Sequence, residues 1–223
     1  MIGETEEEPP VPNYESNVFV NCPFDEEYRP LMRSLLFTII CLGYTPRLAS
    51  ERSDSGENRV DKIGQLIQES KYSIHDLSRL KSDAEGEFYR LNMPFELGLD
   101  YGARRYGSTA MARKRCMILE TAPYDYKIAL SDLSGVDIKT HNDRPEEIVR
   151  AVRDWFYETV GRTNIESPTR IWNQFADFQT YLFESRLGDD LSEEDVTKDI
   201  ERMPISEYID SVNQWVDIGK PGL

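Results

Sequence analysis

The sequence predicts an α/β protein: a flavodoxin-like, doubly wound and mainly parallel sheet, followed by a small α-helical C-terminal element. Up to about residue 162, short runs rich in β-branched and aromatic residues alternate with longer amphipathic segments. Strands that alternate with helices through short connections pair in parallel through right-handed crossovers. After Gly161 this alternation stops, and three helical segments follow without a strand between them.

The predicted strands are short and rich in apolar residues: Asn17–Asn21, Tyr44–Ala49, Lys71–Ser78, Arg115–Thr121 and, at an edge of the sheet, Val136–Thr140. The helices between them carry apolar residues at helical spacing: Glu26–Leu42, Val60–Ser70, Asn92–Arg105 and Pro145–Val160. The C-terminal helices are expected at Pro168–Leu187, Ser192–Arg202 and Ser206–Val216. We therefore divide the chain into an acidic, disordered tail (1–15), an α/β domain (16–162) and a helical element (163–223).

The amino-acid composition of the chain limits the classes of molecule that it is expected to bind. The chain has 223 residues, of which 39% are hydrophobic, and a formal net charge of −15. This balance disfavours direct binding to nucleic acid or to an anionic membrane, because both need a basic surface. The acids concentrate in residues 1–15 and 188–210, which leaves the centre of the chain close to neutral. A small anionic ligand therefore remains possible there.

Cysteine usage and hydropathy indicate a reducing cytoplasm as the expected compartment. The three cysteines are scattered and none forms a CxxC pair, so zinc ribbons and thioredoxin-like sites are not supported. No apolar run approaches the roughly 20 residues of a membrane span. The start of the chain is acidic and proline-rich, unlike a secretory signal. We expect neither a metal nor a bound cofactor.

Common catalytic motifs are missing from the sequence, which contains no GxxxxGK[ST], GxGxxG, HExxH or GxSxG. The two histidines, His75 and His141, are expected to be structural. What remains are polar residues that follow predicted strands, at the edge where open α/β sheets bind ligands. Directly after the first strand come Asn21, Phe24 and Asp25, an amide, an aromatic face and a carboxylate. The alternative is that Asp25 only caps the following helix.

Two further groups follow later strands. Asp76 and Ser78 end the third strand, where a carboxylate can accept hydrogen bonds from ribose hydroxyls or merely cap a turn. Asn92 begins a segment in which Pro94 suits the first helical turn, with Asn92 or Met93 as the cap. Glu96 is then expected in that first turn, where the helix dipole favours its ionised form. The alternative is that Glu96 only stabilises the helix start.

Glycine and arginine residues near these groups lead to two further predictions, one about helix packing and one about phosphate binding. Gly98 and Gly102 leave one face of the helix bare, which predicts close approach to the sheet or to a ligand. Arg52 and Arg59 flank a serine- and glycine-containing loop that can hold a phosphate. A solvated polar loop is the alternative.

The succession VFVNCPFD, SKYSIHDLSR, LNMPFELGLDYGARRYG and KRCMIL resembles the nucleoside 2-deoxyribosyltransferase-like and TIR-like proteins of bacteria, over about residues 17–121. The resemblance implies chemistry at an N-glycosidic bond, with Glu96 as the catalytic carboxylate and Asp76 binding or polarising the sugar. It also implies that Asn21, Phe24 and Asp25 line the base or ribose pocket. Where TIR domains have a serine-rich loop this chain has Asn21-Cys22-Pro23, so the substrate stays open.

The hypothesis is therefore a nucleotide N-glycosidase or ribosyltransferase that acts on NAD or a related nucleotide. The nicotinamide ring of NAD is already cationic and leaves as a neutral molecule. Its departure therefore needs no strong general acid, which fits a site poor in histidine. The resemblance also implies a role as an anti-phage effector. One alternative is a nucleotide-sensing module that binds without cleaving and signals to a partner protein. Another is an assembly subunit, with the aromatic C-terminal helices contacting a second copy or another protein.

Overall fold

The computed structural model describes residues 12–51, 53–79, 91–128, 130–133, 135–187 and 191–221. Its centre is a five-stranded sheet in the order β2-β1-β3-β4-β5, in which every neighbouring pair is parallel. The strands are β1 (Asn17–Asn21), β2 (Thr45–Arg47), β3 (Tyr72–Asp76), β4 (Arg115–Glu120) and β5 (Ile138–Thr140). This order is that of flavodoxin-like folds, so the predicted fold class is confirmed.

The two edge strands are shorter than the sequence predicts. β2 contains Pro46, which has no N–H to give to a ladder and is tolerated only at a sheet edge. β5 pairs with the last part of β4 alone, from Ile118 to Glu120. The first half of β4 therefore has a strand neighbour on one side, β3, among the described residues.

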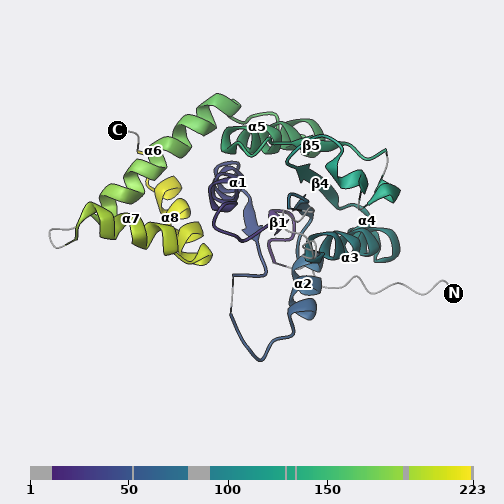
Figure 1. Ribbon diagram of the computed structural model, residues 1–223. Coiled ribbons are helices and arrows are strands. Elements are labelled where there is room, and N and C mark those ends of the chain that lie inside the picture. The colour runs from purple at the N-terminus through teal and green to yellow at the C-terminus, as the bar shows by residue number, and fades with distance from the viewer. Residues whose placement is uncertain are drawn as a thin grey trace.

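Helices cover both faces of the sheet (Figure 1). On one face lie α1 (Arg29–Cys41) and α5 (Pro145–Trp155), which contact each other extensively. On the other face α2 (Arg59–Gln68) packs against α3 (Asn92–Tyr106). Three short helices, absent from the sequence prediction, are too brief for a periodic signal: α4 (Thr109–Ala112) and two 3₁₀ turns, η1 (Asp125–Ile128) and η2 (Ser131–Leu133). The predicted helix ending at Val160 finishes in a π turn, η3 (Phe156–Val160), closed by Gly161 in the left-handed conformation.

Strand alternation divides the apolar core between the two faces. Val18, Val20 and Ile74 point towards α1 and α5 and are at most 1% exposed. Phe19 points the other way and packs with buried residues of α2 such as Ile63. This alternation also decides on which face each site residue lies.

The predicted C-terminal helices are present as α6 (Pro168–Arg186), α7 (Glu193–Arg202) and α8 (Ile205–Asp217). They gather beside α1, on its outer side (Figure 1). The ring of Phe37 in α1 lies 5.2 Å from Phe175, 5.5 Å from Phe178 and 5.6 Å from Trp215, measured between ring centroids. The helical element thus shares one continuous apolar core with the α/β part.

Of the expected N-terminal tail, residues 1–11 lie outside the described part of the chain. Tyr14 lies against the body, because its carbonyl accepts a hydrogen bond from the Lys71 N–H at 3.1 Å and its hydroxyl donates to the Ala110 carbonyl at 3.2 Å. None of the described helices combines the length and apolarity required to cross a bilayer.

Candidate functional site

The candidate site lies where the connections leave the sheet in opposite directions, at the carboxyl ends of β1 and β3. In open α/β sheets this switch point is where ligands bind. Asn21 ends β1, Asp76 ends β3, and α3 brings Glu96 to the same edge. All three side chains are buried, at 1%, 0% and 4% exposure.

Asn21 joins β1, β3 and the start of α3. Its Nδ2 donates to the Met93 carbonyl at 2.9 Å and lies 3.0 Å from Nδ1 of His75. Because a carbonyl only accepts, Nδ2 is the donor, and Nδ1 of His75 must then accept. The His75 proton sits on Nε2, which lies 3.2 Å from Asp100 Oδ2. Oδ1 of Asn21 is buried and has no hydrogen-bond partner among the described residues.

The electrostatic surroundings of His75 favour a protonated ring at neutral pH, whereas its hydrogen bonds are those of the neutral ring. Burial opposes a charge on the imidazole, but Cys116 and Asp100 favour one and raise the pKa of His75 to about 9. The observed hydrogen bonds describe the neutral ring, since a second proton on Nδ1 would point at the Asn21 amide N–H. A charged His75 therefore requires Asn21 to turn.

Asp76 faces the opposite side of the sheet from its neighbour His75, as strand alternation requires. Its Oδ2 accepts a hydrogen bond from the Tyr28 hydroxyl and lies 3.2 Å from Nε2 of His141, while its Oδ1 accepts from the Ser78 N–H at 2.8 Å. Burial alone would raise the pKa of Asp76, but these donors hold it below its ordinary value. Asp76 is thus an ionised anchor between β3, α1 and the loop after β5.

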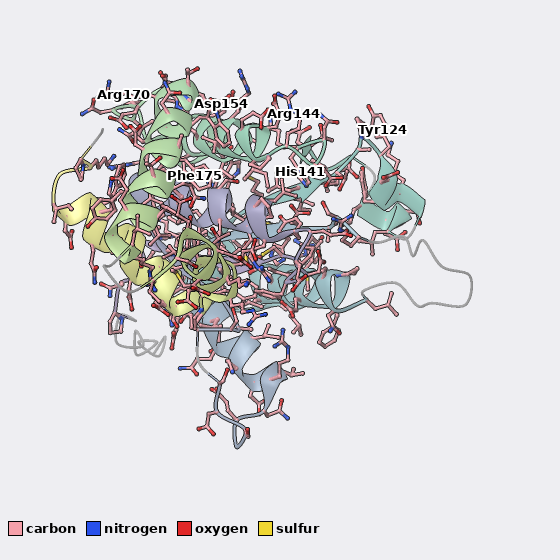
Figure 2. The ribbon with its side chains drawn as sticks, turned by 60° about the vertical axis from the view of Figure 1, so that its left-hand side comes forward. Tyr124, His141, Arg144, Asp154, Arg170 and Phe175 are labelled. Atoms are coloured by element: carbon pink, nitrogen blue, oxygen red, sulfur yellow. The ribbon has the colours of Figure 1, made fainter. Side chains whose placement is uncertain are left out.

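Ser78, His141 and Asp76 lie together but lack the geometry of a catalytic triad. Nδ1 of His141 accepts a hydrogen bond from the Asp143 N–H at 3.1 Å, so a neutral His141 carries its proton on Nε2. That same Nε2 contacts Ser78 Oγ at 2.8 Å. The one Nε2 proton of the neutral ring therefore lies between Ser78 Oγ and Asp76 Oδ2, so Nε2 does not accept the serine proton as a triad histidine must. Figure 2 shows His141 towards the interior and Arg144 on the outer rim.

Glu96 is placed differently from the prediction. The helix α3 begins at Asn92 with Leu91 as its cap, so neither Asn92 nor Met93 caps it and its first turn holds no acid. The reason is that Pro94 sits inside the first turn, where its missing N–H costs nothing, and the helix starts earlier than the proline suggests. Glu96 consequently lies one turn into the helix.

The surroundings of Glu96 favour the protonated, neutral form of its carboxyl group more than water does around an exposed glutamate. Burial raises the pKa of Glu96, and the guanidinium of Arg59 acts in the opposite direction. The Arg59 Nη2 lies 3.9 Å from Glu96 Oε1, and this side chain is 55% exposed. No hydrogen bond to Glu96 occurs within the described ranges, where Arg59 is its ion-pair partner.

Three carboxylates of the site act on the pKa of one buried thiol, that of Cys22. Burial raises the pKa of Cys22 strongly, and Asp76, Glu96 and Asp25 raise it further, in that order. These three carboxylates come from β3, α3 and the loop after β1, and all lie within electrostatic reach of Cys22. Asp76 and Glu96 thus lie at the same edge of the sheet but on its opposite faces.

The remaining predicted residues lie around this centre. Asp25 accepts a hydrogen bond from the Tyr28 N–H at 2.8 Å, as in the capping alternative. Phe24 is 37% exposed and, with Arg29 and Arg33, lines a cavity of about 200 Å³ beneath α7 and α8. Asn92 is exposed at the start of α3. Arg52 lies outside the described residues.

The two glycines of α3 do not have the expected role. A Cβ added at Gly98 or at Gly102 would meet nothing within 4 Å, so these positions face open space and not the sheet. The predicted close approach of α3 to the sheet at these glycines is therefore wrong. The helix turns Glu96, Leu97 and Asp100 inwards instead.

The sequence analysis missed a buried charge network under α3. Asp100 Oδ2 accepts a hydrogen bond from Ser73 Oγ at 2.6 Å, and Asp100 Oδ1 lies 3.3 Å from the ammonium of Lys114. Lys114 is fully buried and donates to the carbonyls of Ile67 and Ser70. The available signal was the alternation of polar residues at 73 and 75 in a strand otherwise fit for the core.

One part of this network has potential metal ligands. Ligand atoms of His75, Asp100 and Cys116 lie within 4.8 Å of one another. The ammonium of Lys114 beside Asp100 already supplies the compensating positive charge, and a cation there would be repelled by it. The donor set therefore fits an internal ion pair better than a metal.

Comparison of the chain with family models, with curated proteins and with solved structures found no match.

Proposed function

We propose that the chain cleaves or transfers the N-glycosidic bond of a nucleotide, with Glu96 as the catalytic carboxylate and NAD or a related nucleotide as substrate. The observation that carries the proposal is the state of Glu96: a nearly enclosed carboxyl at the switch point, with a raised pKa and without a hydrogen bond from the described residues. An acid committed to structure is normally hydrogen-bonded when it is buried.

The chemistry needs a negative charge next to the sugar. As the bond from C1′ to the base nitrogen breaks, its electron pair stays with the base and the ribose becomes an oxocarbenium-like cation. The Glu96 carboxylate stabilises that cation, and water or another base then forms the new bond to C1′. With water as acceptor, NAD yields nicotinamide, ADP-ribose and a proton.

Neighbouring groups support a substrate that carries phosphate. Arg59 lies beside Glu96 with more than half of its side chain exposed, so it is open to an anion. Asp76, saturated by internal donors, positions the end of β3 in this proposal.

The test is chromatography of NAD, NADP, ATP and deoxynucleosides after incubation with the wild type, with Glu96→Gln and with Glu184→Gln, an exposed control on α6. We expect base release by the wild type and by Glu184→Gln, and a loss of roughly 100-fold or more in Glu96→Gln. Arg59→Met should raise KM more than it lowers kcat.

Full turnover by Glu96→Gln would remove Glu96 from the mechanism. Tight binding of a nucleotide that is recovered intact, with the wild type and with added partner proteins, would favour the sensing module instead.

A further inference from the structure

A second cavity lies away from Glu96, at the open edge of β4. It has a volume of about 440 Å³, within the range of small-molecule sites. It exists because β5 is only three residues long and pairs with Ile118–Glu120, which leaves the first half of β4 uncovered on that side within the described chain.

The uncovered part of β4 presents one backbone donor and one backbone acceptor to this cavity. The Arg115 N–H and the Leu119 carbonyl both bond to the β3 side, to Lys71 and Leu77. Because the main-chain groups of successive residues point to alternate sides of a strand, the N–H and C=O of Cys116 point towards the open edge. Neither group bonds to the backbone of any described residue.

The walls of the cavity combine apolar side chains with the charged side chains of Asp137, Lys139 and Glu158. Leu97 and Tyr101 of α3, Ile118 of β4 and Trp155 of α5 line it. Arg104 also lines it, and its Nε is buried without a hydrogen-bond partner within the described ranges. A ring has apolar side chains to contact in this cavity, and the backbone of Cys116 offers hydrogen bonds to its polar edge.

We propose that this cavity binds a planar heteroaromatic ring with an acceptor and an N–H donor side by side, as in nicotinamide or adenine, read by the backbone of Cys116. A single outward-facing residue offers one donor and one acceptor, which suits a small ring better than an added peptide strand with its several hydrogen bonds. The site lies apart from Glu96 and does not depend on the proposed reaction.

The site is also connected to the candidate active site through buried contacts. Asp100 forms part of the cavity wall and bonds to His75, which in turn contacts Asn21 at the end of β1. A ligand in the cavity therefore lies against one end of a chain of polar side chains that leads to the switch point.

The test measures binding to the full wild-type chain, because free bases have no glycosidic bond that the chain could cleave. Nicotinamide and adenine are each titrated by calorimetry, while the amide signal of Cys116 is followed by NMR. We expect one of the two probes to bind and to shift that amide signal. Val136→Trp, which places an indole at the cavity wall, should weaken binding about tenfold or more. Ile218→Trp, an exposed control beyond α8, should bind as the parent does.

Cys116→Ala separates recognition by the backbone from recognition by the thiol, and it should leave affinity within about twofold. The proposal is overturned if neither probe binds at about 10 mM, if Val136→Trp binds as tightly as the parent, or if the Cys116 amide does not respond at saturation. Binding of an extended peptide alone would equally overturn it. Loss of turnover in the Glu96 series leaves this result unaffected, so the two proposals fail separately.

Discussion

Glu96 holds its carboxyl group in surroundings that disfavour a charge, and its pKa is raised mainly by burial. Keeping such a group ionised costs folding free energy unless a donor or a cation compensates. Arg59 compensates in part from 3.9 Å, on a side chain that is half exposed to water. If Glu96 has the proposed catalytic role, function and stability oppose each other at this residue.

A pH prediction follows for Glu96→Gln. For an acid whose pKa is raised on folding, the folded state is favoured while the group is protonated, and this stability is lost as pH rises through the folded pKa. Glu96→Gln, which cannot ionise, should therefore be more stable than the wild type at pH 7. The difference should vanish below the ordinary glutamate pKa of 4.5.

Urea unfolding of both proteins between pH 4 and pH 8 measures this difference. Glu184→Gln, on the exposed face of α6, serves as the control and should track the wild type at each pH. A Glu96→Gln variant that is less stable than the wild type at pH 7 would show that the carboxylate has a stabilising partner.

At the scale of single residues, the sequence predicted that these acids lie at the carboxyl edge of the sheet, but not which partners each of them has. Asp76, Asp25 and Glu96 all reach the carboxyl edge, because each follows or faces a parallel strand end. Asp76 is saturated by Tyr28 and His141, and Glu96 is paired with Arg59, all of which are far from their partners in the sequence.

At the scale of elements, α3 is fixed to the sheet by charge as well as by apolar contact. Asp100 of α3 accepts hydrogen bonds from Ser73 and His75 of β3. It also pairs with the ammonium group of Lys114, which lies in the segment before β4. These donors hold the pKa of Asp100 below its ordinary value although burial acts against them. Removing this one carboxylate leaves Lys114 charged and enclosed.

Asp100→Asn should therefore lower the free energy of unfolding by about 3–5 kcal/mol, the cost typical of a buried pair that loses one partner. Denaturant unfolding at pH 7 measures it. Glu146→Gln, which breaks an exposed pair with Arg144, is the matched control and should cost at most about 1 kcal/mol. The double change Asp100→Asn with Lys114→Met should recover part of the loss. A decrease below about 1 kcal/mol for Asp100→Asn would contradict this account.

At the scale of the whole molecule, the C-terminal helices and the α/β part form a single apolar core. Trp215 of α8 is fully buried and its ring lies 5.6 Å from Phe37 of α1, between centroids. Tyr208 of α8 also donates its hydroxyl to the Arg33 carbonyl at 3.2 Å. The residues at 163–223 that look like a separate element in sequence therefore complete the cover over α1.

Trp215→Ala should lower the free energy of unfolding by about 3–5 kcal/mol, because a large buried ring leaves a cavity. Unfolding should stay a single transition, with coincident midpoints for far-UV circular dichroism and for the fluorescence of Trp155 and Trp172. Tyr106→Ala, at a side chain 84% exposed, should change stability by less than about 0.5 kcal/mol. Two separated transitions would show that the helices fold independently of the sheet.

The sequence by itself determined the order of strands and helices, the parallel sheet and the C-terminal helices, because periodicity and turn residues act locally. It also determined that polar residues gather at the carboxyl edge, since parallel strands all end there. Only the tertiary structure decided that Glu96 lies one turn into α3, that Gly98 and Gly102 face open space, and that β5 leaves Cys116 uncovered. These features depend on contacts between distant segments, and a local pattern carries no information about which donor reaches which acceptor.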